Sequence, residues 1–218
     1  MLLQKWFKMP KRLVIFDMDG TLIDSAEDIT SSINYVRVSI GLPPLKKEEV
    51  VAAINQNEGS LASYFYQTAI YEPTHKALFE AHYYEECTKN VYAYEGIEAM
   101  LETLHENNVA LCVATNAPTL YAKRMLTHLG LESYFFSIEG ADKHRPKPDA
   151  AMLHALMQAN LYDIAKKDRA WMVGDSHKDI AAAQNASIDA IHVGWGFALE
   201  SRFDTIYHPS ELLDIILQ

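Results

Sequence analysis

The first chemically suggestive feature of the chain is a pair of aspartates, Asp17 and Asp19, that directly follows an apolar run. Residues two apart in an extended chain point to the same side, so both carboxylates can face one site beyond the end of that run. Gly20 follows them and allows the chain to turn sharply. Carboxylates this close stay ionised together only if a cation lies between them, and oxygen-rich sites suit Mg²⁺. The pair therefore predicts a divalent-metal site, with a turn cap at Asp17 and a solvated Asp19 as the alternative.

A third aspartate follows a later apolar run in the same way. The run 171–173 leads into Gly174 and Asp175, which repeats the arrangement at Asp17 and predicts a further carboxylate ligand for the metal. Asp179 comes shortly after, near the start of the helix expected there, and we assign it a supporting role. A helix-capping role is the alternative for Asp179.

Two further segments carry groups that suit a phosphoryl ligand. Thr115 and Asn116 end an apolar run just before a helix expected to start near Pro118, and a helix N-terminus offers free N–H groups to an anion. A plain helix cap is an equally good interpretation of this pair. The basic loop 143–149 offers cations that could neutralise charge on a phosphoryl oxygen or on a nucleophile, with a solvated surface loop as the alternative.

The elements that must position these groups alternate along the chain. Short apolar runs rich in Val, Ile and Phe predict buried parallel strands at 12–16, 109–114, 134–138, 171–173 and 190–193. Segments with helical spacing of apolar residues lie between them. This alternation predicts an α/β fold, with a doubly wound parallel sheet and helices on both of its faces. Because the functional groups follow strand ends, such a fold brings them to one edge of the sheet.

Residues 25–92 interrupt the alternation with helix signals and no convincing strand signal. Ser25 and Asp28 predict a capping box at the start of a helix that runs to Gly41, and further helices are expected over 46–55, 61–70 and 74–90. We therefore expect an α/β core formed by residues 1–24 and 93–218 and a helical insertion formed by residues 25–92. Aromatic residues between 64 and 84 predict the insertion's own core, with a base-stacking pocket as the alternative.

Composition excludes several classes of protein. A chain of 218 residues with 49% hydrophobic residues, 9 Gly and 8 Pro is neither disordered nor collagen-like. Its net charge of −10 argues against broad binding to nucleic acid or to an acidic membrane. No apolar stretch reaches transmembrane length, no signal-peptide pattern is found, and two cysteines are too few for a disulfide scaffold. We therefore expect a cytoplasmic protein.

The order of the motifs resembles the haloacid dehalogenase-like (HAD) hydrolase superfamily. The motifs are Asp-x-Asp-Gly-Thr at 17–21, Thr-Asn at 115–116, the lysine and proline of the basic loop, and Gly-Asp-x-x-x-Asp at 174–179. The insertion 25–92 is similar to the small α-helical cap of the phosphoglycolate phosphatase-like branch, which closes over the substrate. The resemblance implies a Rossmann-like core that carries the catalytic site and Mg²⁺ as the cofactor.

The resemblance also implies a role for each motif residue. Asp17 would be the nucleophile and Asp19 the general acid and base, whereas Thr115 and Lys147 would hold the phosphoryl group. Arg145 is the reserve for Lys147, because the loop departs from the family's Lys-Pro-x-Pro pattern. The implied ligands of Mg²⁺ are Asp17, Asp19 and Asp175, with Asp179 in support. Contacts to the substrate are expected from Gly20, Thr21, Asn116 and Asn57.

The implied function is a Mg²⁺-dependent phosphatase that hydrolyses a small phosphate monoester through an aspartyl-phosphate intermediate. Its partner would be a small phosphorylated metabolite. A phosphosugar mutase uses the same aspartate pair and is the alternative, and a non-catalytic binding protein is the less favoured one. The cap loop reads Asn55-Gln-Asn57-Glu58 where the branch often has Gly-x-Gly. This departure weakens the case for phosphoglycolate itself, since a carboxylate substrate calls for a cationic cap group.

Overall fold

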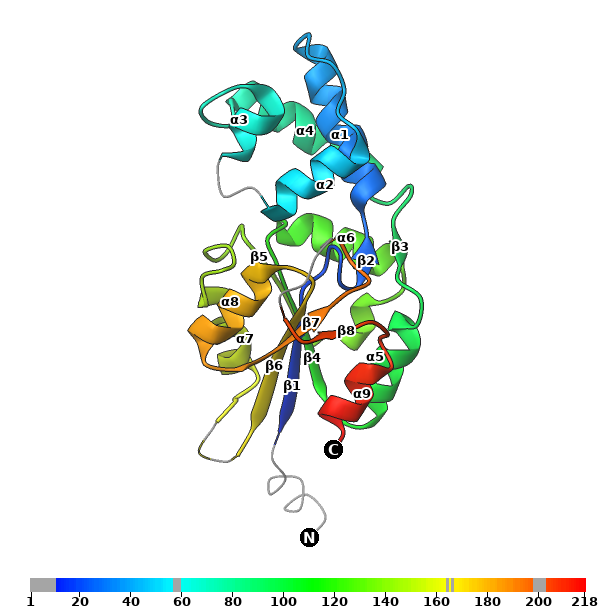
Figure 1. Cartoon of the computed structure of the whole chain (residues 1–218), viewed down its shortest axis with the longest axis vertical. Coiled ribbons are helices and arrows are strands. Elements are labelled where there is room, and N and C mark those ends of the chain that lie inside the picture. The colour runs from blue at the N-terminus through cyan, green and yellow to red at the C-terminus, as the bar shows by residue number, and fades with distance from the viewer. Residues whose placement is uncertain (1–10, 57–59, 164, 166, 198–202) are drawn as a thin grey trace.

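A six-stranded parallel sheet forms the centre of the molecule (Figure 1). The computed structural model describes residues 11–56, 60–163, 165, 167–197 and 203–218. The strand order is β5-β4-β1-β6-β7-β8, and each neighbouring pair is parallel. The strands are β1 (Arg12–Phe16), β4 (Ala110–Thr115), β5 (Ser137–Gly140), β6 (Arg169–Gly174), β7 (Asp189–Val193) and β8 (Thr205–Ile206). This is the strand order of a Rossmann-like sheet, so the predicted fold class is confirmed.

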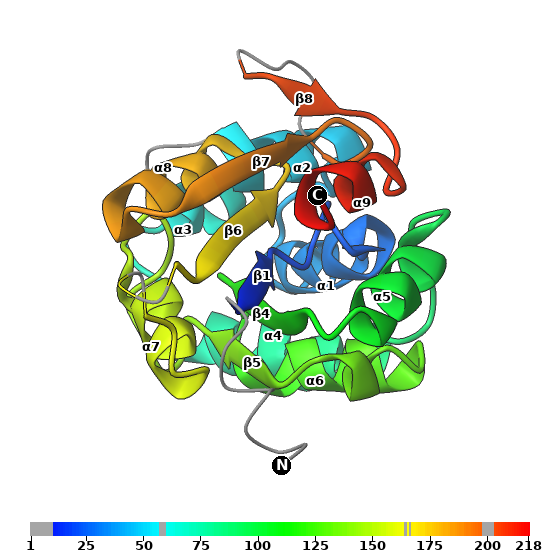
Figure 2. The ribbon, with the colours of Figure 1, turned by 90° about the horizontal axis from the view of Figure 1, so that it is seen from below.

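Helices cover both faces of the sheet (Figure 2). On one face lie α7 (Ala151–Ala159) and α8 (His177–Ala186), and on the other lie α5 (Ile97–Glu106), α6 (Thr119–His128) and α9 (Glu211–Ile216). The alternation of side chains along β1 serves both layers, because Val14 and Phe16 join the α5, α6 and α9 cluster while Leu13 and Ile15 join the α7 and α8 cluster. Strands that are buried on both faces have continuous apolar sequences, and this is why these strands could be predicted from the sequence.

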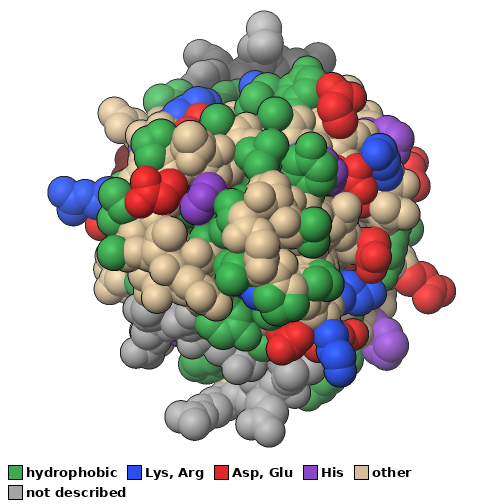
Figure 3. Space-filling view, turned by 90° about the horizontal axis from the view of Figure 1, so that it is seen from above, with side chains coloured by type: hydrophobic (Ala, Val, Ile, Leu, Met, Phe, Trp, Pro, Cys, Tyr) green, Lys and Arg blue, Asp and Glu red, His purple; other side chains and the backbone are tan. Residues whose placement is uncertain are grey.

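The helices of residues 25–92 lie together beyond the carboxyl end of the sheet (Figure 1). They are α1 (Ala26–Ser39), α2 (Lys47–Gln56), α3 (Leu61–Tyr66) and α4 (Pro73–Glu86). We call these four helices the helical unit. Part of the unit has its own apolar cluster, which contains Ile33, Val36, Val50 and Phe65. Hydrophobic side chains gather near the middle of the face seen from above, and most charged ones lie nearer its rim (Figure 3).

Two short strands, absent from the sequence-based expectation, pair where the chain enters and leaves the helical unit. They are β2 (Ile23–Asp24) and β3 (Tyr92–Ala93), and they are antiparallel. The buried Asp28 carboxylate lies beside this pair and accepts hydrogen bonds from the backbone and side-chain nitrogens of Asn90. The segment that enters the helical unit and the segment that leaves it are therefore joined at the base of the unit.

The predicted capping box at Ser25 and Asp28 is wrong. The Ser25 side chain makes no bond to the first turn of α1 and instead donates to the Asp19 carboxylate, while Asp28 binds Asn90. Both side chains have tertiary partners that outcompete the local motif.

Other local predictions needed smaller corrections. The strand expected at 134–138 begins only at Ser137, after the 3₁₀-helix η2 (Glu132–Tyr134). The helix expected over 61–70 ends at Tyr66, because Gln67 adopts a left-handed conformation with φ 58°. The helix expected to reach Asn90 ends at Glu86, and β8 and α9 were not foreseen. Among the described residues, no helix combines the length and apolar character needed to cross a bilayer.

Candidate active site

The candidate site lies at the carboxyl ends of three adjacent strands. Asp17 directly follows β1, Asp175 directly follows β6, and Thr115 is the last residue of β4. The strand order reverses between β1 and β6: the chain continues from β1 to β4 on one side and from β6 to β7 on the other. A crevice opens at such a point of the sheet. Strand ends therefore place the three side chains together although they are far apart in the sequence.

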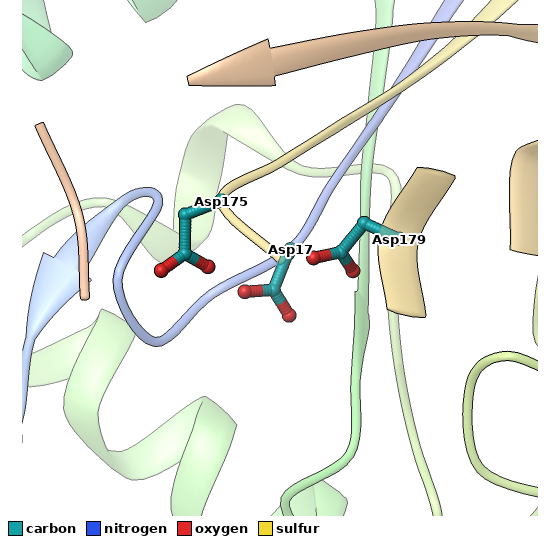
Figure 4. Close-up of side chains that lie close together, drawn as sticks. All are labelled: Asp17, Asp175 and Asp179. Atoms are coloured by element: carbon teal, nitrogen blue, oxygen red, sulfur yellow. The ribbon is translucent and has the colours of Figure 1, made fainter. Parts of the chain in front are cut away.

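Three buried carboxylates converge in this crevice. Oxygens of Asp17, Asp175 and Asp179 lie within 4.8 Å of one another (Figure 4). The Asp19 side chain is not in this group, and its carboxylate accepts a hydrogen bond from the Ser25 hydroxyl. The backbone N–H of Phe197 donates to Asp175 Oδ2 at 2.8 Å, which orients that carboxylate.

Lys147 is the cation of the site. Its Nζ lies 2.5 Å from Asp17 Oδ1 and 2.6 Å from Asp179 Oδ1, and the residue is only 4% exposed. By contrast, the Arg145 side chain is 83% exposed and pairs with Asp149 at 3.4 Å on the surface. The geometry therefore places Lys147, and not Arg145, against Asp17.

Asn116 positions the lysine loop through its side-chain amide. Its Oδ1 accepts from the Lys147 backbone N–H at 2.7 Å, and its Nδ2 donates to the Lys147 carbonyl at 3.0 Å. Both ends of the amide group are thus engaged by one peptide segment. Asn116 was expected to contact the substrate, and its observed contacts hold Lys147 in place.

Asp179 links the lysine to helix α8. It lies in the first turn of that helix, where its Oδ2 accepts from the Ser176 N–H at 3.1 Å and the Ser176 hydroxyl at 2.6 Å. Its other oxygen accepts from Lys147. A side chain on Gly174 would lie 2.3 Å from the Asp179 carboxyl carbon, so the glycine of this motif leaves room for the carboxylate. Asp179 thus both caps the helix and supports the lysine.

Burial shifts the pKa values of these groups. Burial raises the pKa of Asp17 well above its ordinary value, and the Lys147 ammonium opposes this rise. Burial acts to lower the pKa of Lys147, but the carboxylates of Asp17 and Asp179 raise it overall. Burial also raises the pKa of Asp19, and the hydrogen bond from Ser25 opposes that rise. The lysine is therefore held charged, while Asp19 is biased toward its protonated form.

The charges of the buried cluster fit a divalent cation. Three carboxylates, those of Asp17, Asp175 and Asp179, lie beside one ammonium, that of Lys147, so acidic groups outnumber basic ones in this cluster. An all-oxygen donor set of this charge suits Mg²⁺. The residues present therefore fit the expected metal.

The remaining expected residues lie around the same point. The Thr115 hydroxyl is buried and accepts from the Ala117 N–H at 3.0 Å, and Thr21 Oγ1 lies 3.4 Å from Asp17 Oδ2. Gly20 has φ +85°, and a side chain there would lie 2.5 Å from Asp175 Oδ2. Asn57 lies outside the described residues.

A single cavity of about 390 Å³ connects the carboxylate cluster with the helical unit. Seven of the expected residues line it, namely Asp17, Asp19, Thr115, Asn116, Lys147, Asp175 and Asp179. Gly20 and Thr21 are not part of the described lining. The side chains expected from four separate motifs therefore share one cavity.

Sequence reasoning missed Lys178, which also lines the cavity. Its Nζ donates to the Ile54 carbonyl at 2.8 Å, which joins helix α8 of the core to helix α2 of the helical unit. Burial lowers the pKa of this lysine. Its place between Asp175 and Asp179 in the sequence was the available signal, but its partner is distant in the chain and no local pattern indicates it.

Comparison with known proteins agrees with this geometry. A family model described as haloacid dehalogenase-like hydrolase matches residues 14–193. The chain is 33% identical to a phosphoglycolate phosphatase of Agrobacterium fabrum, over 85% of this chain and 81% of that protein. It is 31% identical to a phosphoglycolate phosphatase of Chromobacterium violaceum, over 94% of this chain and 96% of that protein. A solved structure of a predicted phosphoglycolate phosphatase from Haemophilus somnus is similar with a TM-score of 0.81 and 25% identity, over 94% and 97% of the two chains.

Proposed function

Since this chain belongs to the haloacid dehalogenase-like hydrolase family and is a phosphatase, we propose that it hydrolyses a small phosphate monoester with Mg²⁺ through an aspartyl-phosphate. The observation that carries the proposal is the bond of the buried Lys147 ammonium to Asp17, beside Asp175 and Asp179. Asp19 lines the same cavity. Nucleophile, cation, metal ligands and proton donor are thus available at one point.

Asp17 and Asp175 would hold Mg²⁺ through their carboxylates, and Asp19 through its backbone carbonyl. When bound, the ion supplies positive charge that offsets the repulsion between the phosphoryl oxygens and the carboxylates. The convergence of the buried Asp17, Asp175 and Asp179 carboxylates supports this assignment. Asp179 contributes by holding Lys147.

Asp17 is the nucleophile of the proposed reaction. One of its oxygens forms a bond to phosphorus while the bond from phosphorus to the leaving oxygen breaks. Lys147 balances charge on Asp17 and the phosphoryl group, and Thr115 offers its hydroxyl to a phosphoryl oxygen. The contact between Lys147 and Asp17 supports these roles.

Asp19 is the general acid and base. Its protonated carboxyl gives a proton to the departing alkoxide, and the resulting carboxylate then takes a proton from the attacking water. The oxygen of that water forms a bond to phosphorus while the bond from phosphorus to the Asp17 oxygen breaks. The products are the alcohol and inorganic phosphate, and Asp17 and Asp19 return to their starting states. The burial that raises the pKa of Asp19 supports the first of these steps.

We assign residues 25–92 to a cap and residues 1–24 and 93–218 to the catalytic core. The contact of Lys178 with the Ile54 carbonyl supports a cap that meets the core at the edge of the cavity. The free cysteines Cys87 and Cys112 are buried, which favours a reducing compartment, and we place the protein in the cytoplasm. The names of its relatives make phosphoglycolate the first substrate to test.

The proposal is tested by phosphate release from phosphoglycolate, sugar phosphates and nucleoside monophosphates, each with Mg²⁺ and with EDTA. We expect release with Mg²⁺ only, and an Asp17→Asn variant should lose at least about a thousandfold in kcat. Asp189→Asn is the matched control, because Asp189 lies on the surface beside Arg169. Intact mass spectrometry checks that the asparagine has not deamidated. Turnover by Asp17→Asn close to that of the unchanged protein would refute the covalent mechanism.

A further inference from the structure

The cavity has two chemically different ends. One end carries the charged groups of the core, among them Asp17, Asp19 and Lys147. The other end is formed by the helical unit and is lined mostly by aliphatic and aromatic side chains, including Ile33, Val51, Ile54, Leu61, Phe65 and Phe79. A phosphate monoester bound at the charged end would therefore direct its leaving group toward an apolar wall.

The helical unit offers no net positive charge to a leaving group. Among its described residues that line the cavity, Lys76 is the single cation, and its Nζ lies 3.7 Å from a carboxylate oxygen of Glu80, which lines the cavity too. Lys178 reaches the same region from the core, where one of its three N–H donors is taken by the Ile54 carbonyl. A carboxylate on the leaving group would lose water against a mostly apolar wall, on which Lys76 is already paired with Glu80.

Besides tyrosine hydroxyls, the helical unit offers the amide of Asn55 to a neutral ligand atom. Asn55 lines the cavity, and its Nδ2 is buried without a hydrogen-bond partner among the described residues. An amide donor binds a neutral oxygen acceptor and adds no charge to the wall. Aromatic residues of the unit can have two roles. Phe65, for example, belongs to the apolar cluster of the unit and also lines the cavity.

From these contacts we infer that the substrates of this phosphatase are phosphate monoesters of apolar alcohols or phenols, in preference to esters of charged acids such as phosphoglycolate. This inference rests on the proposed function, because the ester must first be hydrolysed at Asp17. A cavity of about 390 Å³ lies in the range that holds molecules larger than glycolate. Each methylene moved from water to the apolar wall adds to binding in the transition state.

The test uses n-alkyl phosphates from methyl to hexyl phosphate, whose leaving oxygens are chemically alike while their apolar surface grows. We expect kcat/KM to rise by about fourfold per methylene until the wall is covered, and to exceed the value for phosphoglycolate at the longer chains. Val51→Thr places a hydroxyl of nearly equal size on the wall and should lower kcat/KM for hexyl phosphate by about fivefold. Val38→Thr is the matched control, since Val38 lies on α1, is 62% exposed and does not line the cavity. It should leave the series unchanged.

The outcomes separate this inference from the proposed function. A flat or falling series, with Mg²⁺-dependent release from methyl phosphate or phosphoglycolate, overturns the inference and leaves the proposed function in place. No Mg²⁺-dependent release from any ester overturns the proposed function and the inference with it. The series measured on the unchanged protein decides the matter by itself if Val51→Thr fails to fold.

Discussion

Replacing Lys147 by methionine, compared with the same change at Arg145, tests the charge arrangement of the site. Lys147→Met removes an ammonium that is bonded to Asp17 and Asp179 at 2.5 and 2.6 Å and is almost fully buried. Methionine keeps an unbranched side chain of similar length, so the change removes charge more than volume. Arg145→Met removes a cation of the same loop that is exposed and pairs with Asp149 on the surface.

The expected magnitudes differ widely between the two variants. Loss of one preorganised charged group at a transition state lowers kcat by roughly 100- to 1000-fold, and we expect this for Lys147→Met. Removing one partner of a buried ion pair costs about 3–5 kcal/mol of unfolding free energy, since Asp17 and Asp179 are left buried without a cation. An exposed pair contributes about 0–1 kcal/mol, so Arg145→Met should change kcat and stability little.

Phosphate release at saturating Mg²⁺ measures kcat, and urea unfolding in EDTA and in Mg²⁺ measures stability. Mg²⁺ should stabilise Lys147→Met more than it stabilises the unchanged protein, because the variant has lost one positive charge beside the expected metal ligands. A larger loss of kcat in Arg145→Met than in Lys147→Met would refute the assignment of the lysine. Equal stability of the two variants in EDTA would refute the argument from buried charge.

Three further substitutions test other parts of the structure. Asp19→Asn cannot donate the proton to the leaving alkoxide, and kcat for alkyl esters should fall by roughly 100- to 10,000-fold while the circular dichroism spectrum is unchanged. Gly20→Ala forces a side chain into a backbone with φ +85° and within 2.5 Å of Asp175 Oδ2, so urea unfolding should show a loss of about 1–3 kcal/mol. Asp28→Ala removes the buried carboxylate that accepts hydrogen bonds from the backbone and side-chain nitrogens of Asn90, and it should lower the unfolding free energy by about 1–3 kcal/mol, whereas an unchanged value would show that the link is dispensable.

Sequence patterns alone identified the α/β class and the motifs from which the proposed site is built. The central strands are buried on both faces, so their composition is apolar throughout, and composition is a local property. Asp17 and Asp175 follow β1 and β6 directly, and parallel strand ends meet at one edge whatever the details of the connections. Adjacency to a strand end was therefore enough to predict that these carboxylates converge.

The local pattern of the basic loop does not distinguish its cations; the family resemblance favoured Lys147, and the tertiary structure shows the contacts that bring it to Asp17. Lys147 and Arg145 lie two residues apart, and both satisfy the pattern of a basic loop. The hydrogen bonds between Asn116 and the Lys147 backbone orient the loop so that Lys147 points to Asp17. Those bonds join residues 31 positions apart, and a local pattern contains no information about them.

Contacts between distant segments also decided the details around the helical unit. Ser25 has the local surroundings of a capping residue, but Asp19 binds its hydroxyl once the chain is folded. The apolar wall of the cavity and the contact of Lys178 with Ile54 arise only where helices of the unit face the core. Local propensities are worth a fraction of a kcal/mol per residue, whereas buried polar groups without partners cost more, so tertiary partners prevail where the two disagree.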